Sequence, residues 1–149
     1  MRAIIVSVLA FAVAASALGR AVVVNNTPET FYLWSVGDET GKQVEVPPGD
    51  IWHEEFHKGS VNPGVAIKIT KEEGGLSLGA PTQIFGYALD GDKVWYSLDA
   101  VNGEPFAGQR LELISSGGDI QWPEGVNTGN ATKDTSSNED VVFTVGGGA

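Results

Sequence analysis

From residue 20 onward the chain has no apolar repeat of 3.6 residues that is long enough for a helix. Short β-branched, aromatic or alternating runs recur instead, and such runs are typical of strands. Asp90-Gly91-Asp92 separates two of these runs and predicts a hairpin turn. The expected strands are 20–26, 30–37, 64–71, 82–89, 93–98, 109–114 and 140–145. This many short strands with frequent turn signals predict an all-β antiparallel sandwich.

The segment 115–139 differs from the rest of the chain, because it is polar and rich in Gly, Ser, Thr and Asn. Its large apolar residues are Ile120, Trp122 and Val126. We interpret it as a long surface loop. No internal repeat or linker divides the chain, so 20–149 is expected to form one small domain.

Residues 1–19 have the layout of a secretory signal peptide: a charge at Arg2, an apolar stretch, and small residues at the end. Ala15-Ser16-Ala17 and Ala17-Leu18-Gly19 both fit the small-x-small cleavage pattern. We take Gly19 as the last leader residue, which makes Arg20 the first residue of the domain. The apolar stretch is short for a membrane span, so we expect a secreted protein without a stable membrane anchor.

Charge and cysteine content exclude several classes of protein. The 149 residues include 9 basic and 19 acidic ones, a formal net charge of −10, and no cysteine. Binding to nucleic acid through phosphates needs clustered Lys and Arg, so no nucleic-acid partner is expected. Disulfides and cysteine-based zinc sites are excluded. Two triplets, beginning at Asn25 and Asn130, fit the N-glycosylation pattern.

His53-Glu54-Glu55-Phe56-His57 matches the H-E-x-x-H motif of zinc hydrolases. That motif works on a helix, where both imidazoles share a face. Here a Pro-Pro-Gly turn precedes it and Gly59 follows closely, so the stretch fits a strand equally well. On a strand the two histidines would lie on one face but about 13 Å apart, too far to share an ion. We therefore expect neither a metal nor a cofactor, and His53 and His57 remain the only metal candidates.

Aromatic and acidic side chains suggest two further kinds of site. Strand alternation places Tyr32 and Trp34 on one face. We expect that face to form an exposed aromatic strip that stacks on sugar rings. The alternative is that these residues belong to the core, where tryptophan in a small β domain more often lies. Paired carboxylates, with Asp99 and Glu104 among the candidates, could hydrolyse a glycoside. A solvated acidic face explains them equally simply.

The chain resembles the yeast-phase-specific, antigenic thaumatin-like proteins secreted by fungi. The resemblance rests on the order and spacing of motifs along nearly the whole domain. They are Ala21-Val22-Val23-Val24-Asn25-Asn26, Phe31-Tyr32-Leu33-Trp34-Ser35-Val36-Gly37, Ile84-Phe85-Gly86-Tyr87, Val94-Trp95-Tyr96, Pro105-Phe106-Ala107-Gly108 and Trp122-Pro123-Glu124-Gly125-Val126. It implies a thaumatin-like antiparallel β-sandwich at the fungal cell surface or exterior. Family members usually carry cysteines, one of them where Thr27 stands here.

The resemblance also bears on activity. Thaumatin-like proteins that act on β-glucan have an acidic cleft, and the matching positions here are Gly86, Ser97 and Asn102, all neutral. Catalysis by carboxyl groups needs ionisable side chains at these positions. We therefore expect a non-catalytic protein that binds a wall glucan or a small metabolite. The residues expected to bind it are Tyr32, Trp34, Trp95, Tyr96, Asp99 and Glu104.

Three alternatives remain open from the sequence. One is a β-1,3-glucanase-like hydrolase that uses Asp99. Another is a zinc hydrolase that uses His53, Glu54 and His57. The third is an antigenic surface protein or an accessory protein of a secondary-metabolite pathway, with no small ligand of its own.

Overall fold

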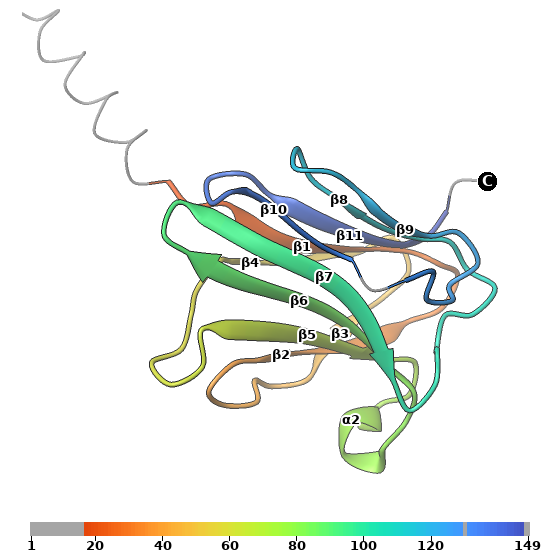
Figure 1. Ribbon diagram of the computed structural model, residues 1–149. Helices are drawn as coiled ribbons and strands as arrows, with labels where there is room; N and C mark the ends of the chain where they lie inside the picture. The colour runs from red at the N-terminus through yellow and green to blue at the C-terminus, as the bar shows by residue number, and fades with distance from the viewer. Residues whose placement is uncertain (1–16, 130, 148–149) are drawn as a thin grey trace, which may run out of the picture.

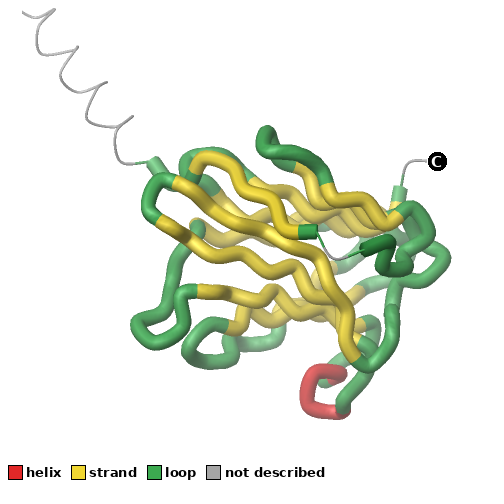
Figure 2. Tube along the Cα trace, in the orientation of Figure 1, coloured by secondary structure: helices red, strands yellow, loops and turns green. Residues whose placement is uncertain are grey.

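Two β-sheets packed face to face make up the computed structural model, which describes residues 17–129 and 131–147 (Figure 1). One sheet has five strands in the order β4-β1-β11-β8-β9, and the other has six in the order β10-β7-β6-β5-β2-β3. The strands are β1 Arg20–Asn26, β2 Phe31–Val36, β3 Val44–Val46, β4 Ile51–Glu55, β5 Gly64–Thr70, β6 Thr82–Asp90, β7 Lys93–Val101, β8 Leu111–Ile114, β9 Ile120–Trp122, β10 Thr132–Ser136 and β11 Val141–Gly146. Figure 2 shows that strands dominate, and the short helix α2 spans Gly75–Leu78. The all-β sandwich expected from the sequence is confirmed.

Alternating side chains explain why these segments form strands with one buried face. In β5, Val65, Ile67 and Ile69 are buried, and the residues between them face outward. The turn expected between β6 and β7 is present, with Asp90 opposite Lys93 and Gly91 at φ +63°. A φ in this region favours glycine, so the hairpin register follows from the turn sequence.

Aromatic side chains from both sheets meet in the core. Phe85 of β6 and Phe143 of β11 are fully buried, with ring centroids 6.1 Å apart. The first and last strands, β1 and β11, pair in parallel, while every other strand pair of the described residues is antiparallel. The strand pair that joins the two halves of the five-stranded sheet therefore comes from the two ends of the domain, not from segments adjacent in sequence.

The interpretation of 115–139 as one long loop is wrong. The segment contains β9, which pairs with β8, and β10, which pairs with β7. Both are edge strands, and the five residues of β10 read Thr-Lys-Asp-Thr-Ser. An edge strand buries few side chains, so a polar sequence can pair without showing an apolar pattern. Trp122 of β9 is fully buried and attaches the segment to the core.

The leader expected at 1–19 lies outside the described residues except for its last three. The structure describes no helix that is both long and apolar enough to cross a membrane within 17–129 and 131–147.

Candidate ligand-binding site

The structure does not bring the six expected binding residues together. Tyr32 and Trp34 lie on the outward face of β2, because Phe31 and Leu33 of the same strand enter the core. Trp95 and Asp99 lie on the outward face of β7, and Trp95 is 37% exposed. No single aromatic strip joins them.

Tyr96 is a core residue and not part of an exposed surface. Only 1% of it is exposed, and its hydroxyl donates to the Gly118 carbonyl at 2.6 Å while accepting from Ser115 Oγ. The physical reason is the alternation of β7, since consecutive residues of a strand point to opposite faces. Trp95 and Tyr96 therefore cannot both line one strand surface.

Trp34 faces outward but is covered by a neighbouring segment. Only 6% of it is exposed, and it borders a hollow together with Gln43, Gly74 and Leu76. The Gln43 side chain accepts a hydrogen bond from the Gly74 amide at 2.7 Å, which holds the α2 segment near this ring. Trp34 therefore presents little surface to a ligand.

The two acidic candidates, Asp99 and Glu104, lie on different segments and do not contact each other through a hydrogen bond that the structure shows. Asp99 is exposed, and its Oδ1 accepts a hydrogen bond from the adjacent Ala100 amide. Glu104 follows β7 in a loop, and its Oε2 accepts a hydrogen bond from the Asn127 amide at 2.7 Å. Each carboxylate therefore accepts a hydrogen bond from a backbone amide of the protein itself.

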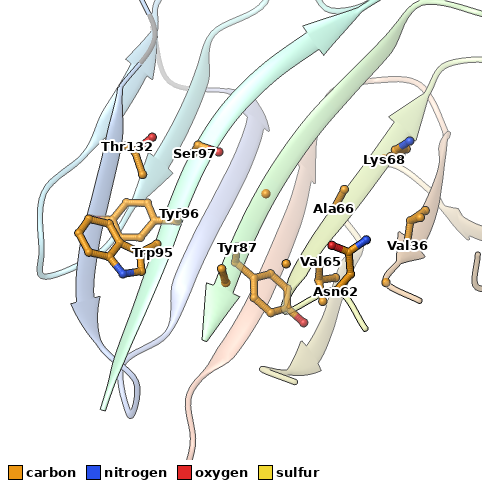
Figure 3. A pocket seen from close by; sticks show the side chains of 14 residues that line it. Val36, Asn62, Val65, Ala66, Lys68, Tyr87, Trp95, Tyr96, Ser97 and Thr132 are labelled. Carbon is orange, nitrogen blue, oxygen red and sulfur yellow. The ribbon is translucent and has the colours of Figure 1, made fainter. Parts of the chain in front are cut away.

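An open groove of about 460 Å³ crosses the outward face of the six-stranded sheet (Figure 3). The strand registers explain its position, because they align Val36, Ala66, Gly86, Ser97 and Thr132 in one row across β2, β5, β6, β7 and β10. We call this row the small-residue groove. A Cβ on Gly86 would lie 3.2 Å from Ser97 Oγ, so even a methyl group would crowd the floor there. The groove exists because this row lacks large side chains.

Larger residues flank the groove on both sides. Trp95 lies two residues before Ser97 along β7, and Lys68 of β5 lies on the opposite side, two residues after Ala66. Five strands about 4.8 Å apart give the row a length of about 19 Å. Flanking residues four positions apart on one strand, such as Trp95 and Asp99, are separated by about 13 Å. A linear oligomer of ring-shaped units, lying along the row, would fit this length and width.

Local contacts orient the Trp95 ring. Its Nε1 donates to Asp90 Oδ2 at 3.3 Å, and the Lys93 ammonium lies 5.8 Å from the ring centroid. Lys93 in turn pairs with Asp134 of β10 at 3.8 Å. A ring held in this way loses little side-chain entropy when it stacks on a ligand.

The H-E-x-x-H sequence lies on β4 and in the turn that follows it, and it forms no helix. Glu54 faces the other sheet, whereas His53 is exposed. His57 lies beyond the end of the strand, and its Nε2 approaches Glu54 Oε2 to 3.2 Å. The histidines therefore do not share a strand face, contrary to the sequence expectation. The described residues contain no group of three His, Asp or Glu side chains that could hold a metal.

Glu54 instead joins the two sheets. Its Oε2 accepts hydrogen bonds from Tyr87 Oη at 2.7 Å and from Ser35 Oγ at 2.9 Å, in addition to the His57 contact. Burial raises the pKa of the Tyr87 phenol above its usual range, and the hydrogen bond to Glu54 raises it further. Tyr87 therefore stays protonated and keeps donating. The cluster was missed in the sequence because its members come from three distant strands.

The two glycosylation triplets have different places in the structure. Asn25 is fully buried, and its Nδ2 donates to the carbonyl oxygens of Glu29 and Val46, both at 2.8 Å. Its Oδ1 accepts from the amide and the hydroxyl of Thr27. Asn130 lies outside the described residues.

The two-sheet sandwich has the thaumatin-like fold, as comparison with solved structures shows. The protein elicitor MoHrip2 from Magnaporthe oryzae superposes with a TM-score of 0.71 at 23% identity, covering 87% of this chain and 99% of that one. The thaumatin-like xylanase inhibitor TLXI superposes with a TM-score of 0.60 at 13% identity, covering 84% and 97% of the two chains.

The chain belongs to the Blastomyces yeast-phase-specific protein family, which it matches over residues 8–146. It is 30% identical over 97 residues to an antigenic thaumatin-like protein of Arthroderma benhamiae, covering 64% of this chain and 48% of the relative. It is 28% identical over 118 residues to the secreted thaumatin-like protein calA of Emericella nidulans, covering 76% and 63%. The resemblance seen in the sequence motifs is confirmed, and the chain is a secreted thaumatin-like protein. It spans about half to two thirds of the length of these relatives.

Proposed function

We propose that this protein binds an extended, uncharged polysaccharide of the fungal cell wall along the small-residue groove, without cleaving it. The observation that carries the proposal is the exposed Trp95 ring, held at the side of an open groove about four strand spacings long. Indole rings stack well on the apolar faces of sugars. An uncharged ligand suits a chain with a formal charge of −10, because an acidic polymer would be repelled.

Polar groups in and beside the groove can donate hydrogen bonds to sugar hydroxyls and accept hydrogen bonds from them. Ser97 and Thr132 offer hydroxyls, Lys68 offers an ammonium and Asn62 offers an amide. The groove is lined by neither Asp nor Glu among the described residues. The lining itself therefore supplies no general acid for glycoside hydrolysis, and Asp99, which flanks the groove on β7, is tested separately below.

A pull-down on insoluble β-1,3-glucan and on chitin tests the proposal. The wild-type protein should be retained on at least one of these polymers at low and at moderate salt. Trp95→Ala should weaken retention by about 5- to 150-fold, taking the contribution of about 1–3 kcal/mol that an aromatic side chain makes when it stacks on a nucleic-acid base. Ala66→Phe, which fills the row, should weaken it similarly.

Leu78→Ala is the matched control, because Leu78 is 75% exposed on α2, outside the groove lining. It should bind like the wild type. Folding of each variant is checked by its thermal unfolding midpoint. Wild-type protein that is folded and yet is retained on neither β-1,3-glucan nor chitin would refute the proposal.

The hydrolase alternative is tested in the same preparation. Reducing ends released from laminarin should stay at the level of a protein-free blank, with and without the Asp99→Asn change. Release that depends on Asp99 would replace binding by a catalytic function.

A further inference from the structure

The residue expected to end the leader is instead part of the folded domain. The Gly19 amide donates to the Ser137 carbonyl at 2.8 Å, and the Gly19 carbonyl accepts from the Phe56 amide at 3.1 Å. The bond from Phe56 continues the pairing of β1 with β4, in which Arg20 lies opposite Glu55, and the bond to Ser137 joins Gly19 to the turn between β10 and β11. Gly19 is also buried, whereas Ala17 and Leu18 are exposed.

The space around Gly19 requires glycine. A Cβ at this position would overlap the carbonyl oxygen of Glu139 in the turn between β10 and β11. That turn is fixed in place independently, because the Ser137 amide donates to the Asp92 carbonyl at 2.8 Å. Gly19 therefore fits between the segment after β4 and the turn between β10 and β11, at the start of β1.

Removal of Gly19 would leave two backbone groups without their partners. Ser137 and Phe56 are 9% and 1% exposed, so the freed carbonyl and amide would be poorly placed to bind water. An unpaired buried backbone group is destabilising. Cleavage after Gly19 would thus weaken the domain that it releases.

We propose that the leader is removed between Ala17 and Leu18, so that the mature protein begins at Leu18 and keeps Gly19. Ala15 and Ala17 then occupy the two positions before the cut at which a signal peptidase needs small residues. The bond is exposed in the structure and is followed directly by the buried glycine. Hydrolysis consumes one water, leaving a carboxylate on Ala17 and an ammonium on Leu18.

The intact mass of the protein secreted by a fungal host from the full chain tests this assignment. We expect a product that begins at Leu18. Ala15→Phe should reduce that product at least fivefold, because it places a large residue third before the cut. Ser16→Phe is the matched control and should leave it unchanged, since the middle position of the pattern tolerates any residue. A product that begins at Arg20, or one insensitive to Ala15→Phe, would overturn the proposal.

A second measurement does not depend on processing. Chains beginning at Leu18 and at Arg20 can be released from a removable tag and compared by thermal unfolding. The chain that lacks Gly19 should unfold at a midpoint about 3–8 °C lower, as expected for the loss of two backbone hydrogen bonds. Equal midpoints would show that Gly19 is dispensable and would overturn the structural half of the proposal.

Discussion

Tyr87 of the six-stranded sheet donates its phenolic proton to Glu54 of the five-stranded sheet, with 2.7 Å between Oη and Oε2. This is a polar link between two layers that otherwise meet through apolar side chains. Phe56 lies against the Tyr87 ring, with centroids 5.1 Å apart, so the link borders the core. Because this hydrogen bond borders the core, its loss should measurably lower the free energy of unfolding.

The first prediction concerns Tyr87→Phe. The change removes one hydrogen bond to a charged acceptor and should lower the free energy of unfolding by about 1.5–3 kcal/mol at neutral pH. Denaturation in urea measures it. Tyr32→Phe is the control, because Tyr32 is on the outward face of β2 and should change stability by less than about 0.5 kcal/mol.

The same pair should make stability depend on alkaline pH. The pKa of Tyr87 is higher in the folded than in the unfolded chain, so its contribution is fully present below the unfolded value, about 10. Above that value the unfolded state loses the phenolic proton first, and stability falls. The wild type should lose more stability than Tyr87→Phe between pH 9 and 11.5. Parallel pH profiles of the two proteins would contradict this assignment.

The third prediction concerns Asp38, which holds the loop before β5. Its carboxylate accepts hydrogen bonds from the amides of Ser60, Val61 and Asn62. These bonds, with that of Asn62 the strongest influence, lower the pKa of Asp38. The loop should therefore stay ordered above the ordinary aspartate pKa and loosen only as the pH falls through the lower folded value.

Amide hydrogen exchange at neutral pH measures how strongly the Asp38 carboxylate holds this loop. Asp38→Asn should speed exchange at Ser60 and Asn62 roughly tenfold, because an amide is a weaker acceptor than a carboxylate. Exchange in β6 should be unaffected, since local opening of a loop does not require the sheet to open. Unchanged exchange at Ser60 and Asn62 would show that the loop is held by other contacts.

The fourth prediction concerns Asn25, whose side chain uses both donors and its acceptor in buried hydrogen bonds. Asn25→Ala should destabilise the protein by about 2–4 kcal/mol, because it removes buried hydrogen bonds to the Val46 carbonyl and from the Thr27 amide. Asn138→Ala, at an exposed position, is the comparison and should be close to neutral. Equilibrium denaturation of both variants decides the matter.

The fifth prediction concerns glycosylation. The secreted, folded protein should carry no glycan on Asn25, since one Nδ2 hydrogen would be replaced and the site is fully buried. Any glycan should therefore disappear in the variant Asn130→Gln. Mass spectrometry before and after enzymatic deglycosylation gives the answer, and a glycan retained in that variant would contradict it.

The fold class and most of the strands could be predicted from the amino-acid sequence alone. Apolar alternation in β5 and the Asp-Gly-Asp turn between β6 and β7 act over a few neighbouring residues, so they are readable without a structure. Edge strand β10 was missed because its residues are polar and pair without burying much surface. Motif order alone was also enough to recognise the family.

The groove, in contrast, could be found only from the folded structure. Val36, Ala66, Gly86, Ser97 and Thr132 are unremarkable individually, and they form a groove only when five strands take their observed registers. In the same way, Glu54, Tyr87 and Ser35 meet because two sheets pack together, and Gly19 is enclosed because distant turns close around it. Such contacts join residues far apart in the chain, and no local pattern carries their spacing.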